Sequence, residues 1–171
     1  MLSFSDHKEY GSRYGASVKT SSSEYDNLIA QANTTSLLAG YHPKLLIVNI
    51  PAADEFAHDS LYAKYIGAIR QADTIVAAIW NAIRTDTLLH GKTTMVVTND
   101  HGRHTSDYTD HGDTCEGCRH IMLLVIGPDT PIGVVDSTVH KQIDIAPTVG
   151  ALLGFKTPYS AGVAIESAVV K

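Results

Sequence analysis

The chain has 171 residues, with 18 acidic, 13 basic and 9 histidine side chains and a formal net charge of −5. Hydrophobic residues make up 44% and charged residues 18% of the chain, which is typical of one globular domain spanning residues 1–171 and argues against a long disordered tail. The sequence has neither a basic stripe with interleaved aromatic residues nor an apolar run near the roughly 18 residues of a membrane span, so we expect neither nucleic acid nor a membrane as a partner.

The first elements are a helix and a strand that follow a polar start. Residues 1–20 are rich in Gly and Ser and lack periodicity, so we expect them to be poorly ordered. The polar residues 21–24 predict a helix start, apolar residues follow at helical spacing, and Gly40 ends the helix. The continuous apolar run at residues 44–50 predicts a parallel strand that is buried on both faces.

The rest of the chain continues this alternation of helix and strand. An amphipathic pattern predicts a long helix over residues 59–84, and residues 93–98 predict a second buried strand. A polar loop without structure of its own is expected over residues 99–119, and loops of that length are usually functional. Residues 121–126 predict a third strand, and residues 143–153 predict a helix.

Helices that alternate with buried strands indicate an α/β fold with three αβα layers and a mostly parallel sheet. In such sheets the functional residues lie just beyond the carboxyl ends of the strands. Those positions follow Ile50 and Thr98, where the chain does carry unusual polar residues.

The first polar motif follows the strand at residues 44–50. Asp54 and His58 are four residues apart at the start of a helical pattern, so their side chains share a face if this turn is helical. A carboxylate oxygen and an imidazole nitrogen are both good zinc ligands. Asp54 could instead cap the helix while His58 is an ordinary surface residue.

Two further motifs follow the strand at residues 93–98. Asp100 and His101 stand at its tip, and Gly102 permits a turn that brings them together, although a plain polar strand end fits as well. His111 lies in the long loop, where it could complete a site with Asp54 and His58 or be a solvated loop residue. Three protein ligands and one open position are typical of a catalytic zinc site.

The order of these motifs resembles the alkaline phosphatase superfamily, and within it the type I phosphodiesterase and nucleotide pyrophosphatase branch. The resemblance covers about residues 24–156. It rests on D-x-x-x-H after one strand, D-H-G after the next and H-G about ten residues later. The Gly127-Pro128 pair after the third strand matches that branch, and residues 144–154 match the D-I-A-P-T…L-L-G helix of the superfamily.

The resemblance implies two zinc ions in the intact family and a phosphate-ester small molecule as substrate. Asp54, His58 and His111 match the ligands of one zinc, and Asp100 and His101 match two ligands of the second. A further aspartate and a nucleophilic Ser or Thr belong to a preceding part of the family fold.

No counterpart of that preceding part is evident before the strand at residues 44–50, where no apolar run leads to an Asp. The chain is therefore expected to be the C-terminal, metal-binding half of a phosphoric ester hydrolase, inactive or weakly active alone. A sulfatase-like hydrolase of the same superfamily and a non-catalytic metal-binding domain are the alternatives. A half-domain exposes a sheet edge, so self-association is also expected.

The two cysteines, Cys115 and Cys118, form a C-x-x-C motif in the long loop. With His111 or His120 they could hold a structural zinc ion. A small disulfide or two plain thiols are equally open, while a redox role is disfavoured because the motif does not open a helix after a strand. His104, like His120, is expected to be an ordinary polar residue or to support the metal ligands indirectly.

Overall fold

The structure is a computed structural model that describes residues 23–169. The expectation for residues 1–20 lies outside the described residues. Within them, no helix has the length and apolar character needed to cross a membrane. In chain order the elements are α2 (Ser23–Tyr41), α3 (Ala52–His58), α4 (Tyr62–Thr85), β1 (Met95–Thr98), α5 (Glu116–Arg119), β2 (Leu123–Ile126), the 3-10 turn η1 (Gln142–Asp144), α6 (Ile145–Leu153) and the 3-10 turn η2 (Glu166–Ala168).

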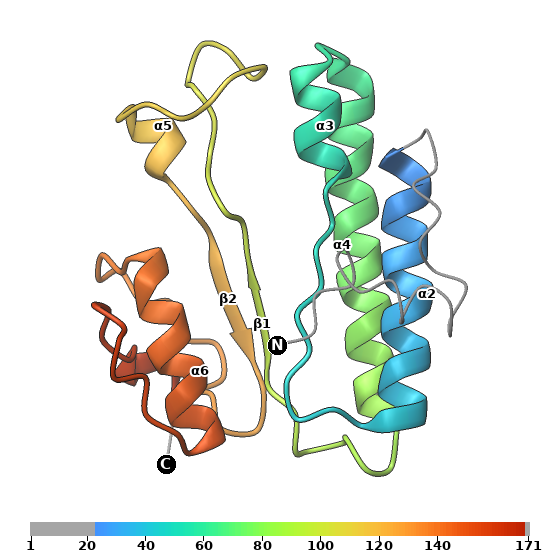
Figure 1. The fold of residues 1–171 in the computed structure, drawn as a ribbon, viewed down its shortest axis with the longest axis vertical. Coiled ribbons are helices and arrows are strands. Elements are labelled where there is room, and N and C mark those ends of the chain that lie inside the picture. The colour runs from blue at the N-terminus through green and yellow to red at the C-terminus, as the bar shows by residue number, and fades with distance from the viewer. Residues whose placement is uncertain (1–22, 170–171) are drawn as a thin grey trace.

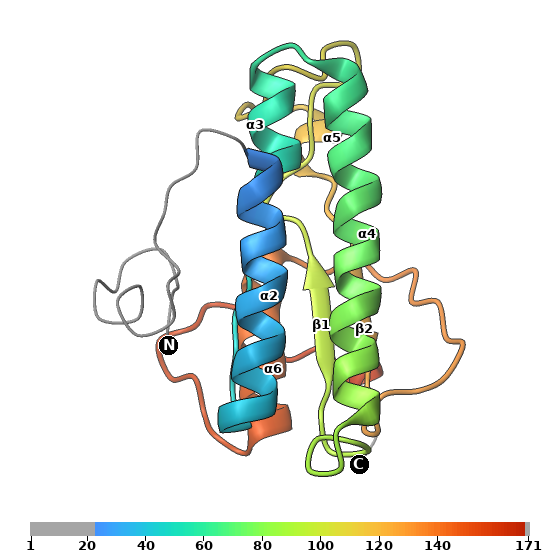
Figure 2. The ribbon, with the colours of Figure 1, turned by 90° about the vertical axis from the view of Figure 1, so that its right-hand side faces the viewer.

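The elements lie in layers that the two ribbon views show from perpendicular directions. Helices α2, α3 and α4 pack together on one side, the β1–β2 ribbon follows, and α6 lies on its other side (Figures 1 and 2). The main core is built from α2, α4 and the turn after α4. Its buried members are Leu38, Ile75, Ile79, Ile83 and Leu89.

The helices predicted at both ends of the described chain are confirmed. Helix α2 ends one residue after Gly40, and His42 then turns the chain with a φ of 45°. Helix α6 ends at Gly154, whose φ of 77° is the left-handed conformation that glycine adopts most easily.

The helix predicted over residues 59–84 is confirmed as α4, and a separate short helix, α3, precedes it. Helix α3 ends at His58, and α4 begins only at Tyr62. Ser60 lies between them with a φ of 59°, which interrupts the right-handed helical backbone. The break lets α3 fold back against α4, which buries Phe56 and Ala68 in a second small core cluster.

The expected sheet is only partly present. Strands β1 and β2 pair antiparallel, with Met95 opposite Ile126, so this pair does not confirm the mostly parallel sheet that the sequence predicts. A parallel pair needs a crossover back to the same end of the sheet. Here the intervening chain turns back at the carboxyl end of β1 without one, as Figure 1 shows. These strands are also only partly buried, with Leu123 and Leu124 exposed.

The apolar run at residues 44–50 is extended but forms no strand with the described residues. Leu46 and Ile50 pack on the main core, while the alternate residues Leu45 and Ile47 are 41% and 45% exposed. The expectation of burial on both faces is therefore wrong, because the helical layer covers one face and no described residues cover the other.

A buried asparagine fixes where α3 begins. The Asn27 side chain is fully buried, and its Oδ1 accepts a hydrogen bond of 3.3 Å from the backbone N–H of Ala52. Its Nδ2 donates to Gln71 Oε1 at 2.8 Å, which ties α2 to α4. An unpaired N–H at a helix start is costly when buried, so Asn27 stabilises the first turn of the helix that carries Asp54 and His58.

Candidate metal centre

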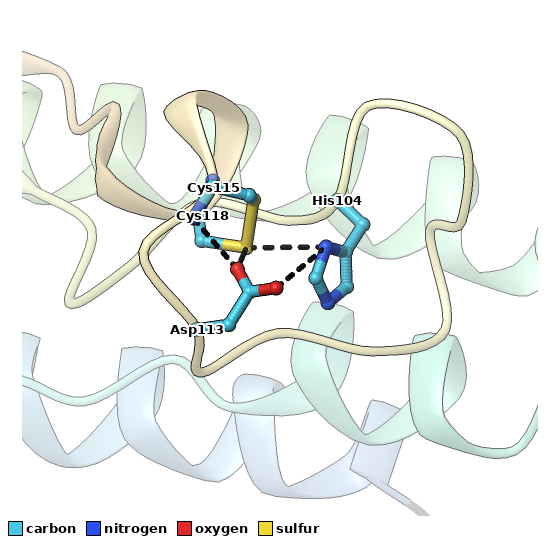
Figure 3. A group of neighbouring side chains, drawn as sticks. All are labelled: His104, Asp113, Cys115 and Cys118. Carbon is cyan, nitrogen blue, oxygen red and sulfur yellow. Dashed lines mark hydrogen bonds and ion pairs between the residues drawn. A yellow bond between two sulfur atoms is a disulfide. The ribbon is translucent and has the colours of Figure 1, made fainter.

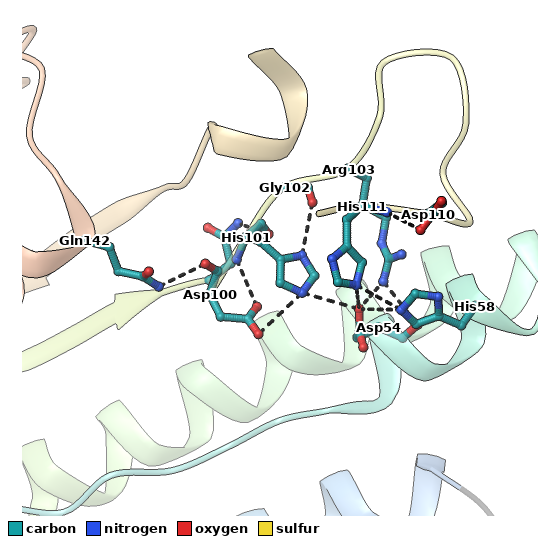
Figure 4. A network of polar contacts seen from close by, with 10 residues as sticks. Asp54, His58, Asp100, His101, Gly102, Arg103, Asp110, His111 and Gln142 are labelled. Atoms are coloured by element: carbon teal, nitrogen blue, oxygen red, sulfur yellow. Dashed lines mark hydrogen bonds and ion pairs between the residues drawn. The ribbon is translucent and has the colours of Figure 1, made fainter. Parts of the chain in front are cut away.

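One carboxylate lies at the centre of three imidazoles (Figure 4). Asp54 Oδ1 is 3.5 Å from Nε2 of His58, 3.7 Å from Nε2 of His101 and 3.6 Å from Nε2 of His111. Asp54 and His58 come from one face of α3, as their spacing predicts, while His101 and His111 come from the loop after β1. Segments far apart in the sequence thus meet at one point.

His101 is oriented by its own backbone neighbour. Its Nδ1 lies 3.0 Å from the carbonyl oxygen of Gly102, and because a carbonyl oxygen can only accept, Nδ1 must carry the proton. In a neutral ring this leaves the Nε2 lone pair free, and Nε2 is the atom that faces Asp54. A metal-binding histidine commonly has this second hydrogen bond, which fixes its tautomer and its ring plane.

The imidazoles lie close together, and this arrangement affects the charge state of His111. His101 and His111 are stacked with ring centroids 3.6 Å apart, and the Nε2 atoms of His58 and His111 are 3.0 Å apart. Partial burial lowers the pKa of His111, and the nearby His101 lowers it further. The negative charge of Asp54 raises this pKa, but the lowering effects are larger. A lowered pKa favours the neutral form of His111, which is the form that binds a metal ion.

The donor set fits a transition-metal ion. The ligand atoms of Asp54, His101 and His111 all lie within 4.8 Å of one another. Bonds of about 2.0 Å at a tetrahedral angle separate ligand atoms by roughly 3.3 Å, close to the spacing seen here. Imidazole nitrogens suit zinc and its neighbours, whereas magnesium and calcium prefer oxygen-only sites.

Asp100 lies at the edge of this group. Its Oδ2 is 3.5 Å from His101 Nε2, and its side chain is 81% exposed. His101 Nε2 is thus nearly as close to Asp54 as to Asp100. These distances group His101 with both carboxylates, whereas the sequence predicts that it shares a metal ion with Asp100 and not with Asp54. Gln142, which opens η1, donates to the backbone carbonyl of Asp100 at 2.9 Å and holds the tip of the motif.

Arg103 is a site residue that the sequence reasoning missed. Its guanidinium Nη2 donates to the Asp54 carboxylate and, at 3.2 Å, to the Asp54 carbonyl oxygen. The side chain is only 11% exposed, and its Nη1 is buried without a hydrogen-bond partner among the described residues. Its position directly after the D-H-G motif could have indicated this role, because a basic residue beside predicted carboxylate ligands can form an ion pair with one of them.

The loop that carries His101 and His111 is packed against α5, so it is not the unstructured segment that the sequence predicts. The backbone N–H of Gly102 donates to the Cys118 carbonyl at 2.9 Å. A Cβ atom at Gly102 would lie 1.9 Å from the carbonyl oxygen of Gly117, and one at Gly117 would lie 2.3 Å from that of Arg103. Two glycines thus allow the backbones to touch beside the metal centre.

A comparison with known protein families identifies the family of this chain. The model of the family described as "Metalloenzyme superfamily" matches residues 2–157. The chain therefore belongs to the Metalloenzyme superfamily, which is alkaline-phosphatase-like and implies an α/β, metal-dependent hydrolase-family domain.

A curated relative adds a second, weaker comparison. The chain is 34% identical over 98 residues to the protein named "Arylsulfatase K" of Xenopus laevis, and the match covers 56% of this chain. It spans only 18% of the length of that relative. No solved structure matches the chain significantly.

Proposed function

We propose that this chain supplies the metal-binding part of a zinc-dependent phosphoric ester hydrolase of the phosphodiesterase or pyrophosphatase kind. The observation that carries the proposal is the convergence of three imidazole Nε2 atoms on one carboxylate oxygen, all within 3.7 Å. Nitrogen-rich sites of this kind favour zinc. The strands described here would then belong to a larger three-layer αβα sheet of the alkaline-phosphatase type.

Two ligand sets follow from the superfamily pattern. Asp54, His58 and His111 would hold one zinc ion, and Asp100 and His101 would contribute to the second. When bound, such ions polarise an ester oxygen and lower the pKa of a hydroxyl or water nucleophile.

The remaining residues of the site orient these ligands. Arg103 holds the Asp54 carboxylate through its hydrogen bond and offsets part of its charge. The Gly102 carbonyl keeps the His101 ring turned with Nε2 toward the centre. These two contacts would orient Asp54 and His101 toward the bound ion.

A sulfatase-like activity is the second candidate, and the similarity to a protein named "Arylsulfatase K" favours it. Phosphate diesters and sulfate monoesters both present a singly charged tetrahedral group. Sulfatases of this superfamily use a calcium site, and calcium sites are built from oxygen atoms. The imidazole-rich ligand set therefore supports the phosphate ester. A direct comparison of the two ester classes distinguishes these candidates.

We expect the zinc-loaded chain to bind a phosphate diester but to hydrolyse it weakly, since no residue here matches the superfamily nucleophile. The measurement uses the cobalt-substituted protein, whose visible spectrum should change with bis(4-nitrophenyl) phosphate and should not change with 4-nitrophenyl sulfate. His58→Ala should lose the response, and release of nitrophenolate should stay near the metal-free background.

Three results would count against this proposal. A response to the sulfate ester alone would favour the sulfatase-like function. Rapid hydrolysis would show that the chain supplies its own nucleophile. No response to either ester would favour a non-catalytic metal-binding domain.

A further inference from the structure

A second group of metal-ligating side chains lies in the same loop but outside the predicted centre. It comprises His104, Asp113, Cys115 and Cys118, whose ligand atoms all lie within 4.8 Å of one another. Figure 3 shows the four side chains turned toward a common point, with the two sulfur atoms joined as a disulfide. His104 and Asp113 take the places that the sequence suggested for His111 or His120.

The distances between these groups suit a tetrahedral ion. Cys118 Sγ lies 3.6 Å from His104 Nδ1 and 3.3 Å from Asp113 Oδ1, and His104 Nδ1 lies 3.8 Å from Asp113 Oδ2. Zinc bonds of about 2.0 to 2.3 Å at a tetrahedral angle place ligand atoms roughly 3.3 to 3.8 Å apart. The two sulfur atoms are closer to each other because they are bonded.

The backbone around the cysteines already has the form of a metal-binding turn. The N–H of Cys118 donates to Cys115 Sγ at 2.9 Å, and the N–H of Cys115 donates to Asp113 Oδ1 at 2.7 Å. Donors of this kind stabilise the negative charge of a thiolate and a carboxylate. Cys118 is buried and Cys115 and His104 are half-buried, while Asp113 is exposed at the open side of the group.

We propose that, once the disulfide is reduced, His104, Asp113, Cys115 and Cys118 bind a structural zinc ion. Reduction by a phosphine consumes one water and yields two thiols and one phosphine oxide. The thiols then release two protons, and both thiolates bind the ion with the His104 nitrogen and one Asp113 oxygen. Two thiolates and an imidazole are a soft donor set, which selects zinc over magnesium or calcium.

The position of this site links it to the principal centre, which is the group formed by Asp54, His58, His101 and His111. Gly117 and Cys118 contact the backbone of Gly102 and Arg103 directly, through the 2.9 Å hydrogen bond from the Gly102 N–H and the close packing at both glycines. An ion held by the cysteine turn would therefore brace the segment that presents His101. The disulfide braces the same turn in the oxidised protein, so the loop has one cross-link in either state.

The test is cobalt binding to the full chain before and after treatment with a phosphine reductant. The reduced wild type should bind one more equivalent of cobalt than the oxidised protein, and it should gain the near-ultraviolet charge-transfer absorption of a cobalt–thiolate bond. Only sulfur ligands give that absorption, so the oxidised protein is the internal control, and an ion at the principal centre does not contribute.

Four variants separate this site from its surroundings. Cys118→Ser should abolish the charge-transfer absorption, and His104→Asn should weaken cobalt binding at least about tenfold, as expected for loss of one ligand. His120→Asn, an exposed histidine outside the group, and His58→Ala should both retain the absorption. If the reduced wild type gains no thiolate absorption, or if His104→Asn binds cobalt as tightly as wild type, the proposed site is wrong.

Discussion

Gly102→Ala is expected to destabilise the protein by about 3 kcal/mol, near the upper end of overpacking substitutions. The added Cβ would lie 1.9 Å from the Gly117 carbonyl oxygen and 2.8 Å from that of His120, which are both backbone atoms that cannot rotate away. The loop must then separate from α5. Because this loop presents His101 and His111, zinc affinity should fall by about tenfold or more, the range typical of lost support around a metal ligand.

Gly40→Ala is the matched control for this effect. Gly40 lies in the last turn of α2, and no atom comes within 4 Å of a Cβ placed there. Alanine should be neutral or stabilise the helix by up to about 1 kcal/mol. Urea unfolding and a zinc titration measure both variants. A Gly102→Ala protein with wild-type stability and zinc affinity would show that the close contact between these backbones is not made in solution.

Ile75→Ala is expected to cost about 2 to 5 kcal/mol of unfolding free energy, because it leaves a cavity in a packed core. Ile75 is 1% exposed and lies in α4 at the centre of the cluster that joins α2, α4 and the turn after α4. None of the predicted metal ligands belongs to this cluster. Zinc content at saturating metal should therefore stay close to wild type while the protein remains folded.

Ile69→Ala provides the comparison on the same helix. Ile69 is 44% exposed, so the same truncation removes little buried surface and should cost well under half as much. Equilibrium unfolding in urea gives both values under one set of conditions. Equal destabilisation by the two substitutions would contradict the assignment of this face of α4 to the core.

The sequence predicted the helices better than the sheet. Helical periodicity is local, and it located α2, α4 and α6 to within a few residues. The sequence left a helical turn at Asp54 and His58 conditional, and the end of α3 before Ser60 could not be predicted because serine gives no signal for a left-handed conformation. The run at residues 44–50 predicted burial on both faces, but an apolar composition does not say how many covering layers are present, and Leu45 and Ile47 remain exposed.

At the candidate site, residue type and spacing predicted those ligands that lie at or just beyond the end of a helix or strand. Asp54 and His58 could be paired from their separation of four residues, and His101 could be placed at a strand tip. Arg103 and His104 could not be assigned in this way. Their roles depend on where a long loop folds back, which brings Arg103 to α3 and His104 to the cysteines.

The most direct test of the metal centre is the zinc content of the chain purified without chelator and without reductant, so that Cys115 and Cys118 stay oxidised. We predict near-stoichiometric zinc in the wild type, a large loss in His58→Ala, and no loss in His90→Ala, which removes an exposed histidine beyond the end of α4. A wild type without zinc, or a His58→Ala protein that retains all of it, would contradict a metal centre built on Asp54, His58 and His111.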